Sequence, residues 1–307
     1  MRENFPSIHL RTKGGRLVAR DGVVLCFFMR RPHGEIASAV WGALQTYRRA
    51  IPPQSLNWYG SDDGDSLALD DKGWEHLRKK MLERSWGDAW TVDLEEHGSE
   101  VGGYNFEYRG WRLDAPAFSH DADSACGVTF SFPTEYLLEH GAAQLRALAL
   151  ELARELPFTF GYASLALVSP RGLWYAARQE LPGPLSRYLG LDLYHLDDTS
   201  MVIGTRARGA YWLTFLGQPL LGQLGGTEAL RHSLPFPEVT FQSLEGERLL
   251  LTLGEWPDAI DTQKEVNVPQ YRALALLLEP FLYEERTGWF SLDKAHLRRW
   301  LRRLCFK

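Results

Sequence analysis

Residues 127–168 read GVTFSFPTEYLLEHGAAQLRALALELARELPFTFGYASLALV, and this stretch decides the fold. Its start alternates, with Val128, Phe130 and Phe132 on one side, which predicts a strand with one buried face. Its end, Tyr162–Val168, is an apolar run followed closely by a proline, which predicts a central strand. Two such strands with helical sequence between them indicate a sheet that has helices packed against it.

The sequence between these strands predicts two helices. Thr134 follows Pro133 and is the expected N-cap of the first helix, which we expect to end at Gly141. The second helix runs to Glu155 and carries a leucine stripe on one face. The stripe consists of Leu145, Leu148 and Leu152.

Outside this stretch, hairpins and helices alternate without a regular order. Asp21-Gly22 lies between two apolar runs and predicts a tight hairpin turn, because glycine tolerates the positive φ of such turns. Residues 57–71 are rich in turn formers and are expected to be a loop. Further helices are predicted at 35–50 and 71–84, from Pro269 under an Asn267–Gln270 capping box, and from about Ser291. Further strands are predicted at 90–94, 104–109, 210–216, 238–243 and 248–253.

This irregular order favours an α+β protein with a mostly antiparallel sheet and helices packed on one face, rather than a doubly wound parallel sheet. The length of 307 residues allows one large domain or two ordinary ones. We expect a single domain over residues 1–307. Residues 170–185 are the place where a boundary between two sub-lobes could fall.

Composition and charge argue against several functional classes. The formal net charge is −5, whereas general nucleic-acid binders are usually basic, so we expect no direct binding to nucleic acid. Cys26, Cys126 and Cys305 lie far apart and indicate neither a zinc site nor a disulfide framework. No apolar run approaches the roughly 20 residues of a membrane helix, and residues 1–15 lack the apolar core of a signal peptide. We expect a cytoplasmic protein without a cofactor or a membrane contact.

The sequence contains no complete catalytic or phosphate-binding motif. Ser164 lies inside a predicted strand rather than in the strand-to-helix turn of a nucleophile elbow, so we expect it to be structural. His120 and Asp123 near Cys126 are residue types that bind metals. A polar loop before a strand explains these three residues better than a metal site does.

One further cluster resembles a nuclease core. Asp258, Asp261 and Lys264 follow the order of the Pro-Asp…(Asp/Glu)-x-Lys pattern of restriction-type nucleases, in which carboxylates bind Mg²⁺ and the lysine stabilises developing charge. The last two residues have the wrong spacing, and the segment is a predicted loop. An uncharacterised metal-dependent hydrolase or nuclease is therefore kept only as an alternative to a binding role.

Acidic residues are concentrated in one part of the chain. From Asp62 to Glu135 there are 17 Asp and Glu against 7 Lys and Arg, a local balance of 7 − 17 = −10. Such asymmetry can steer a charged partner, although solvated loops explain it equally well. The candidate partner-binding residues are Trp58, Tyr59, Asp62, Asp63, Asp65, Asp70, Asp71, Asp93, Glu95, Glu96 and Glu100. The predicted last helix carries the opposite charge and is expected to expose Lys294, Arg298, Arg299, Arg302, Arg303 and Lys307.

Three short motifs give the chain a resemblance to a known family. They are Phe132-Pro133-Thr134-Glu135-Tyr136, Gly161-Tyr162-Ala163, and Trp300 with Arg302-Arg303. With these motifs the chain resembles the type VI immunity family of bacteria over about residues 15–304.

The resemblance implies an antitoxin that binds a toxin delivered by a type VI secretion system. Several toxins paired with this family resemble restriction-endonuclease-fold DNases. An inhibitor of such a nuclease would present carboxylates to the basic surface that binds phosphate. The expected function is therefore that of an immunity protein that occludes the active site of its cognate effector toxin, with a secretion-system adaptor as a further alternative. The family supplies no catalytic residues that could be carried over to this chain.

Overall fold

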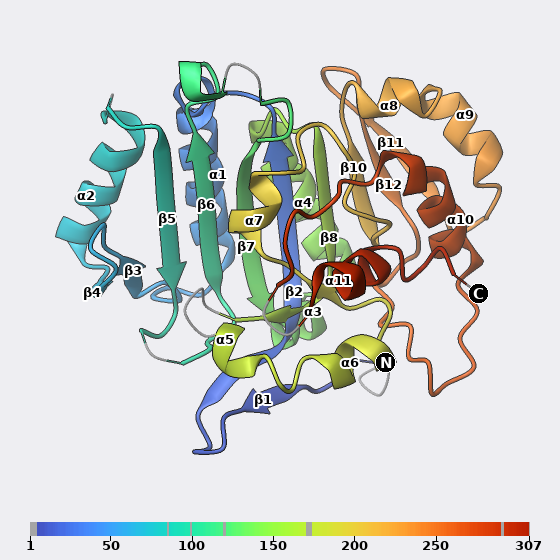
Figure 1. Cartoon of the computed structure of the whole chain (residues 1–307), viewed down its shortest axis with the longest axis horizontal. Helices are drawn as coiled ribbons and strands as arrows, with labels where there is room; N and C mark the ends of the chain where they lie inside the picture. Colours follow the sequence, from blue (N-terminus) through green and yellow to red (C-terminus); the bar gives the residue numbers. More distant parts are fainter. Residues whose placement is uncertain are drawn as a thin grey trace.

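The computed structural model describes residues 5–84, 86–98, 100–118, 121–169, 174–289 and 292–306. These residues form one sheet of 12 strands, whose main path runs β11-β12-β10-β8-β2-β7-β6-β5-β3-β4, with β1 beside β2 and β9 beside β8 (Figure 1). All pairs are antiparallel except β8–β9. The strands are β1 (His9–Arg11), β2 (Leu17–Met29), β3 (Trp58–Gly60), β4 (Ser66–Ala68), β5 (Ala89–Glu95), β6 (Asn105–Trp111), β7 (Cys126–Pro133), β8 (Phe160–Val168), β9 (Asp192–Leu193), β10 (Leu213–Leu216), β11 (Thr240–Leu244) and β12 (Arg248–Thr252).

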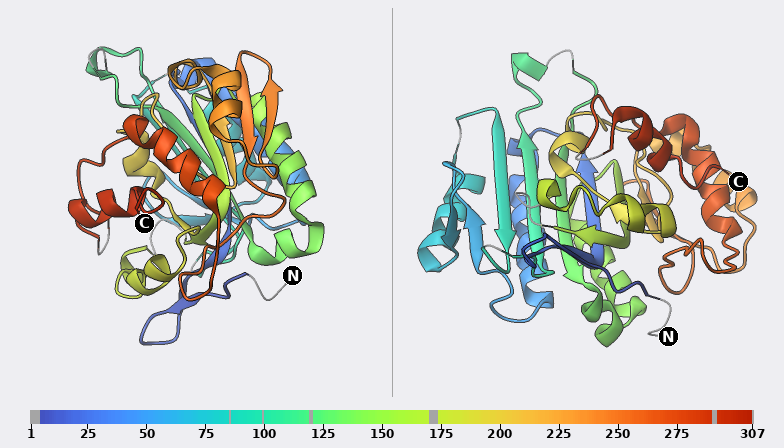
Figure 2. Two further views of the ribbon diagram at one scale, coloured as in Figure 1. Left: turned by 90° about the vertical axis from the view of Figure 1, so that its right-hand side faces the viewer. Right: turned by 60° about the horizontal axis from the view of Figure 1, so that its bottom comes forward.

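Helices cover both faces of this sheet. The α-helices are α1 (His33–Ala50), α2 (Asp71–Leu82), α3 (Thr134–His140), α4 (Ala142–Glu155), α5 (Trp174–Ala177), α6 (Pro182–Arg187), α7 (Leu196–Ser200), α8 (Leu220–Gln223), α9 (Gly226–Ser233), α10 (Pro269–Leu278) and α11 (Lys294–Leu301). Helices α1 to α4 pack together on one face, as expected, and the short α5 and α7 lie against the other face (Figure 2). The predicted α+β class with a mostly antiparallel sheet is confirmed.

The centre of the sheet corrects one prediction. No turn occurs at Asp21-Gly22, because β2 runs straight through both residues. Gly22 lies opposite Pro133 in β7 and Ala166 in β8. The Asp21 carboxylate is buried and accepts hydrogen bonds from the Ile8 N–H and the Thr134 hydroxyl, each at 2.6 Å. A dipeptide typical of turns is therefore held inside a strand by partners that are distant in sequence.

Two helix starts also differ from prediction. The Thr134 hydroxyl binds Asp21, so it does not cap α3, and Pro133 holds the N-cap position without a side-chain hydrogen bond. At α10 the N-cap is Val268. The predicted capping box is absent there, because the Gln270 side chain donates to the carbonyl of Leu253 instead (3.1 Å).

The last helix is shorter and less solvated than expected. Ser291 and Lys307 lie outside the described residues, and α11 begins at Lys294 after an N-cap at Asp293. Arg303 does not face solvent, since its guanidinium donates to the carbonyls of Leu189 (2.6 Å) and Leu191 (3.2 Å). Arg302 is likewise mostly covered and pairs with Glu284 (2.6 Å).

The predicted loop at 57–71 contains two strands. Trp58 pairs with Ala68 and Tyr59 with Leu67, so β3 and β4 form a small hairpin. β3 also pairs with β5, which places the hairpin at one end of the main sheet path. Strands from both sides of residues 170–185 belong to the same sheet, because β8 pairs with both β2 and β10.

Candidate functional site

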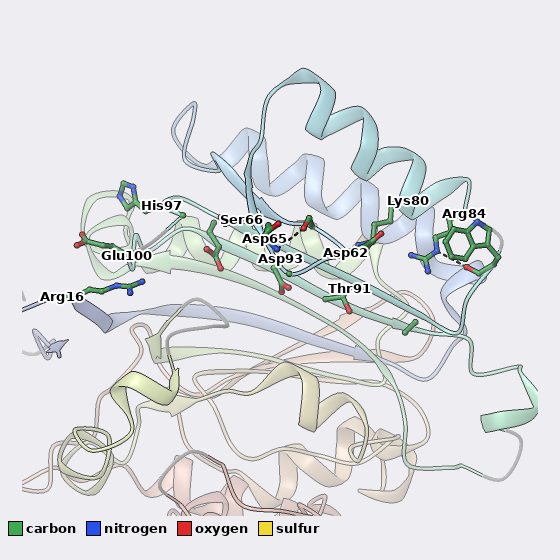
Figure 3. Close-up of a pocket in the computed structure, with 17 residues that line it drawn as sticks. Arg16, Asp62, Asp65, Ser66, Lys80, Arg84, Thr91, Asp93, His97 and Glu100 are labelled. Atoms are coloured by element: carbon green, nitrogen blue, oxygen red, sulfur yellow. Dashed lines mark hydrogen bonds and ion pairs between the residues drawn. The ribbon is translucent and has the colours of Figure 1, made fainter. Parts of the chain in front are cut away.

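An open groove lies on the sheet face at the β5-β3-β4 end, with a volume of about 1010 Å³ (Figure 3). Its floor is β5, in which successive side chains point to opposite faces. Thr91, Asp93 and Glu95 point into the groove. The intervening residues of β5 are buried on the face that carries α1 and α2. The alternation of this strand thus places two carboxylates on the open face.

The walls of the groove come from three other parts of the chain. The β3–β4 turn contributes Asp62 and Asp65, and Arg16 approaches from the β1–β2 connection. Lys80 of α2 donates to Asp62 at 2.5 Å, and this hydrogen bond lowers the pKa of the aspartate. Glu100, from the segment after β5, also lines the groove. We call this site the acidic groove.

Asp93 is held by a buried arginine of the neighbouring strand. Arg109 is 1% exposed and contacts Asp93 Oδ1 through Nη2 at 2.7 Å. The same guanidinium donates to both carboxylate oxygens of Asp197 in α7, at 2.6 and 3.1 Å. Burial would lower the pKa of Arg109, but Asp93 and Asp197 raise it above its usual value. Arg109 therefore stays charged and fixes Asp93 on the groove floor.

A third carboxylate completes this buried network. Glu107 is fully buried, and burial raises its pKa to about 7 although the positive charge of Arg109 opposes the shift. Its Oε1 accepts a hydrogen bond from the Tyr194 hydroxyl at 3.0 Å. The network links the groove floor to α7 on the covered part of the same sheet face.

Glu95 is in a different situation. Burial raises the pKa of its carboxyl to about 7, and the charge of Asp93 adds to the shift. Asp93 has Arg109 as a partner, whereas the Glu95 carboxyl forms no ion pair with another described residue. Glu95 is thus a half-buried carboxyl that holds a proton about half of the time at neutral pH.

The rim carries an aromatic residue that the sequence analysis missed. Trp86 lines the groove and is 70% exposed. Arg84 lies over its ring, 4.1 Å from the centroid, and donates to its carbonyl oxygen at 3.0 Å. A tryptophan that remains this exposed is unusual away from binding surfaces. Trp86 belongs to no periodic pattern in the sequence, so nothing there distinguished it from a core tryptophan.

Some of the predicted partner-binding residues line the groove, and the others lie outside it. The groove is lined by Asp62, Asp65, Asp93, Glu95 and Glu100. Asp63 is exposed in the same turn, and Trp58 is half-buried beside Gly98. Tyr59 packs against α2, near His76. None of these three lines the groove, and neither do the remaining three. Asp70 caps α2 (2.9 Å to the Gly73 N–H), Asp71 is in the first turn of that helix, and Glu96 lies against Gly102.

The nuclease-like residues are engaged in local structure. Asp261 accepts two hydrogen bonds from Arg187, at 2.8 and 2.9 Å, which lower its pKa to about 2. Asp258 accepts from the Ile260 N–H at 2.7 Å. Both carboxylates therefore stabilise one loop.

The other chemical candidates are engaged in the same way. His120 lies outside the described residues, and Asp123 pairs with Arg206 and Arg286. Cys126 is buried, and burial raises the pKa of its thiol to about 12. Ser164 donates to the Gly190 carbonyl at 3.1 Å. Within the described ranges, no group of three or more His, Cys, Asp or Glu side chains could hold a metal ion.

Comparison with known protein families identifies the family of this chain. A family model described as type VI immunity for VRR-NUC (TsiV) matches residues 39–304. The chain belongs to this family. No curated protein matches it. Among solved structures it is similar to the Pseudomonas aeruginosa T6SS protein PA0821, with 20% identity, a TM-score of 0.80, and coverage of 99% of this chain and 88% of that chain. At this identity the likeness shows a shared fold.

In this TsiV family member, the motifs that suggested the family are packing elements. A Cβ at Gly161 would lie 2.4 Å from the Phe27 ring. The Tyr162 hydroxyl donates to Asp192 at 2.8 Å. Trp300 stacks with Arg303, whose guanidinium lies 4.2 Å from the ring centroid. None of these residues lines the acidic groove. Among the described residues, no helix is both long and apolar enough to cross a membrane.

Proposed function

We propose that this chain is the immunity protein of a VRR-NUC effector and that it neutralises the effector by binding, through the acidic groove, over the nuclease active site. The family match carries the first part of the proposal. The second part rests on charge, because a nuclease must present cationic groups to the phosphates of its substrate. A toxin that acts on nucleic acid would be met in the cytoplasm, which is where we place the protein.

The groove has the composition that such a partner requires. Its lining carries five carboxylates against three Lys or Arg, a balance of 3 − 5 = −2. Lys80 is already paired with Asp62, and Arg84 is stacked on Trp86. Asp65, Glu95 and Glu100 therefore face an incoming cationic surface.

The aromatic anchor of the interface is assigned to Trp86. Tyr59 packs against α2, and Trp58 is covered in part by Gly98. Trp86 needs no rearrangement to reach a partner, and exposed tryptophans are enriched among residues that dominate binding energy. A standard interface buries on the order of 1,600 Å² in total, so the contact would extend beyond the groove onto β4 and the end of α2.

Charge reversal inside the groove tests the proposal. The groove variant combines Asp65→Lys and Glu100→Lys, which are exposed and line the groove. The control combines Glu151→Lys and Glu238→Lys, which are exposed elsewhere and make the same change in net charge. We expect the groove variant to bind the effector at least about tenfold more weakly, with a flatter dependence on salt, and to fail to protect cells that express it. Equal loss of affinity in the groove variant and the control, or no loss in either, would show that the interface lies elsewhere on the protein.

A further inference from the structure

The floor of the acidic groove contains two carboxyls that are not equivalent. Asp93 and Glu95 are two residues apart on β5 and point to the same face. Glu95 lies between Trp58 of β3 and Asn105 of β6. Asp93 lies opposite Glu107 of β6.

The contacts of these two carboxyls separate their roles. Asp93 contacts Arg109 at 2.7 Å, and Arg109 is also bound to Asp197, so this pair is fixed within the protein. Among the described residues, the Glu95 side chain has no hydrogen-bond or ion-pair partner, and burial and the negative charge of Asp93 raise the pKa of its carboxyl. A half-buried carboxylate beside a second carboxylate is costly until a cation reaches it.

The other charged groups of the groove do not supply that cation. Lys80 binds Asp62 at the wall, and Arg84 lies over Trp86 at the rim. The other ionisable residues that line the groove are Arg16, Asp65, His97 and Glu100. None of these groups forms a hydrogen bond or an ion pair with the Glu95 side chain.

On the basis of the proposed function, we propose that Glu95 is a binding residue of the groove, that it receives one lysine or arginine side chain of the effector, and that this contact displaces a proton. The ammonium or guanidinium group takes the place of the proton, so the carboxylate becomes paired at the moment of binding. The O–H bond of the carboxyl breaks, its electron pair stays on the carboxylate, and the proton leaves to solvent. Asp93 and Arg109 act as positioning residues that hold the floor in place.

This exchange makes the affinity for the effector depend on pH. With half-ionisation near pH 7, about one tenth of Glu95 is ionised at pH 6 and about nine tenths at pH 8. If only the ionised form accepts the cation, the affinity for the effector falls about tenfold from pH 8 to pH 6. The effector has titrating groups of its own, so the informative quantity is the difference between wild type and a Glu95 variant.

The experiment compares wild type with Glu95→Gln, and uses Glu238→Gln as the control outside the groove. The probe is a catalytically inactive VRR-NUC effector that this chain neutralises on co-expression. Calorimetric titration at pH 6, 7 and 8, in two buffers of different ionisation enthalpy, gives the dissociation constant and the number of protons released. Urea unfolding of each variant, measured in parallel, shows that the nearly isosteric Gln preserves the fold.

We expect wild type and Glu238→Gln to release about half a proton more at pH 7 than Glu95→Gln does. The Glu95→Gln variant should also lack the roughly tenfold fall in affinity from pH 8 to pH 6. It should bind the effector more weakly than wild type at pH 8. Identical proton release in all three proteins would overturn the role of Glu95 while leaving the proposed function intact. A wild-type chain that neutralises no VRR-NUC effector would instead overturn the proposed function.

Discussion

Gly22 shows how tightly the centre of the sheet is built. It lies in β2 between β7 and β8, and a Cβ there would approach the Phe132 carbonyl oxygen at 2.6 Å and Val168 Cγ2 at 2.7 Å. One obstacle is backbone and the other is a β-branched side chain in a fully buried strand, and neither can move cheaply. Glycine is therefore required here by the close approach of neighbouring groups.

Substitution of Gly22 by alanine should destabilise the protein. Overpacking of this kind costs about 1–3 kcal/mol, so the urea midpoint of Gly22→Ala should fall clearly. Gly34 in the first turn of α1 is the matched control, because a Cβ there meets nothing within 4 Å. Gly34→Ala should be neutral or stabilising, since alanine is the better helix former. A Gly22→Ala protein as stable as wild type would show that β2 is not packed as described.

The same residues show where the sequence is ambiguous. Asp21-Gly22 has the local chemistry of a turn, and Thr134 has that of a helix cap. Their side chains instead bind each other, at 2.6 Å, across 113 positions of the chain. The burial of Arg109 between Asp93 and Asp197 is also a product of tertiary structure. Short-range patterns carry no information about such partners.

At the scale of elements, long periodic segments were predictable and short ones were not. Helices α1, α2 and α4, and the β11–β12 hairpin, lie where the sequence predicted them. Their apolar periodicity repeats over several turns or along paired strands. β3 and β4 have three residues each and are held by their neighbours, since β4 pairs with β3 and β3 pairs with β5. That neighbour is not visible in the local sequence.

The C-terminal helix is attached by an arginine that the sequence analysis assigned to solvent. Arg303 should be essential for this attachment, because it donates to the carbonyls of Leu189 and Leu191. In Arg303→Ala these carbonyls lose their donors, at about 1–3 kcal/mol for each buried group left unpaired. We expect a lower urea midpoint and faster amide hydrogen exchange in α11.

Arg299 provides the control for this prediction. It lies in α11, four residues before Arg303, and is exposed, so Arg299→Ala should change the stability by no more than about 0.5 kcal/mol. Similar effects of the two substitutions would mean that α11 is held by its apolar face alone.

At the scale of the whole molecule, the site arises from the order of the strands. The sequence showed that acidic residues crowd between positions 62 and 135, but it could not show which of them would meet. The β3–β4 hairpin folds beside β5 and brings Asp62 and Asp65 to the side of Asp93 and Glu95. The same arrangement uses Asp70 to cap a helix instead. The count of charged residues therefore identified the acidic part of the sequence. Only the strand topology determined which of these residues line the groove.

The ionisable groups of the molecule also make its stability depend on pH in a predictable direction. Burial is the main cause that raises the pKa values of Glu95, Glu107 and Glu285 to about 7. Between about pH 4.5 and 7 the folded protein then holds more protons at these carboxyls than the unfolded chain does. The free energy of unfolding therefore decreases as the pH rises through this range and on to about 8. Burial lowers the pKa of His33 to about 4, which has the opposite sign but acts only below about pH 6.5.

The three carboxyls outweigh the imidazole of His33 above pH 6, so the urea midpoint should be higher at pH 6 than at pH 8. Glu107→Gln should reduce this difference, because it removes one of the three titrating carboxyls and leaves an amide oxygen for the Tyr194 hydroxyl. Equilibrium unfolding at pH 6, 7 and 8, followed by tryptophan fluorescence, measures both effects. A midpoint that rises from pH 6 to pH 8 would show that these carboxylates are compensated in the folded state.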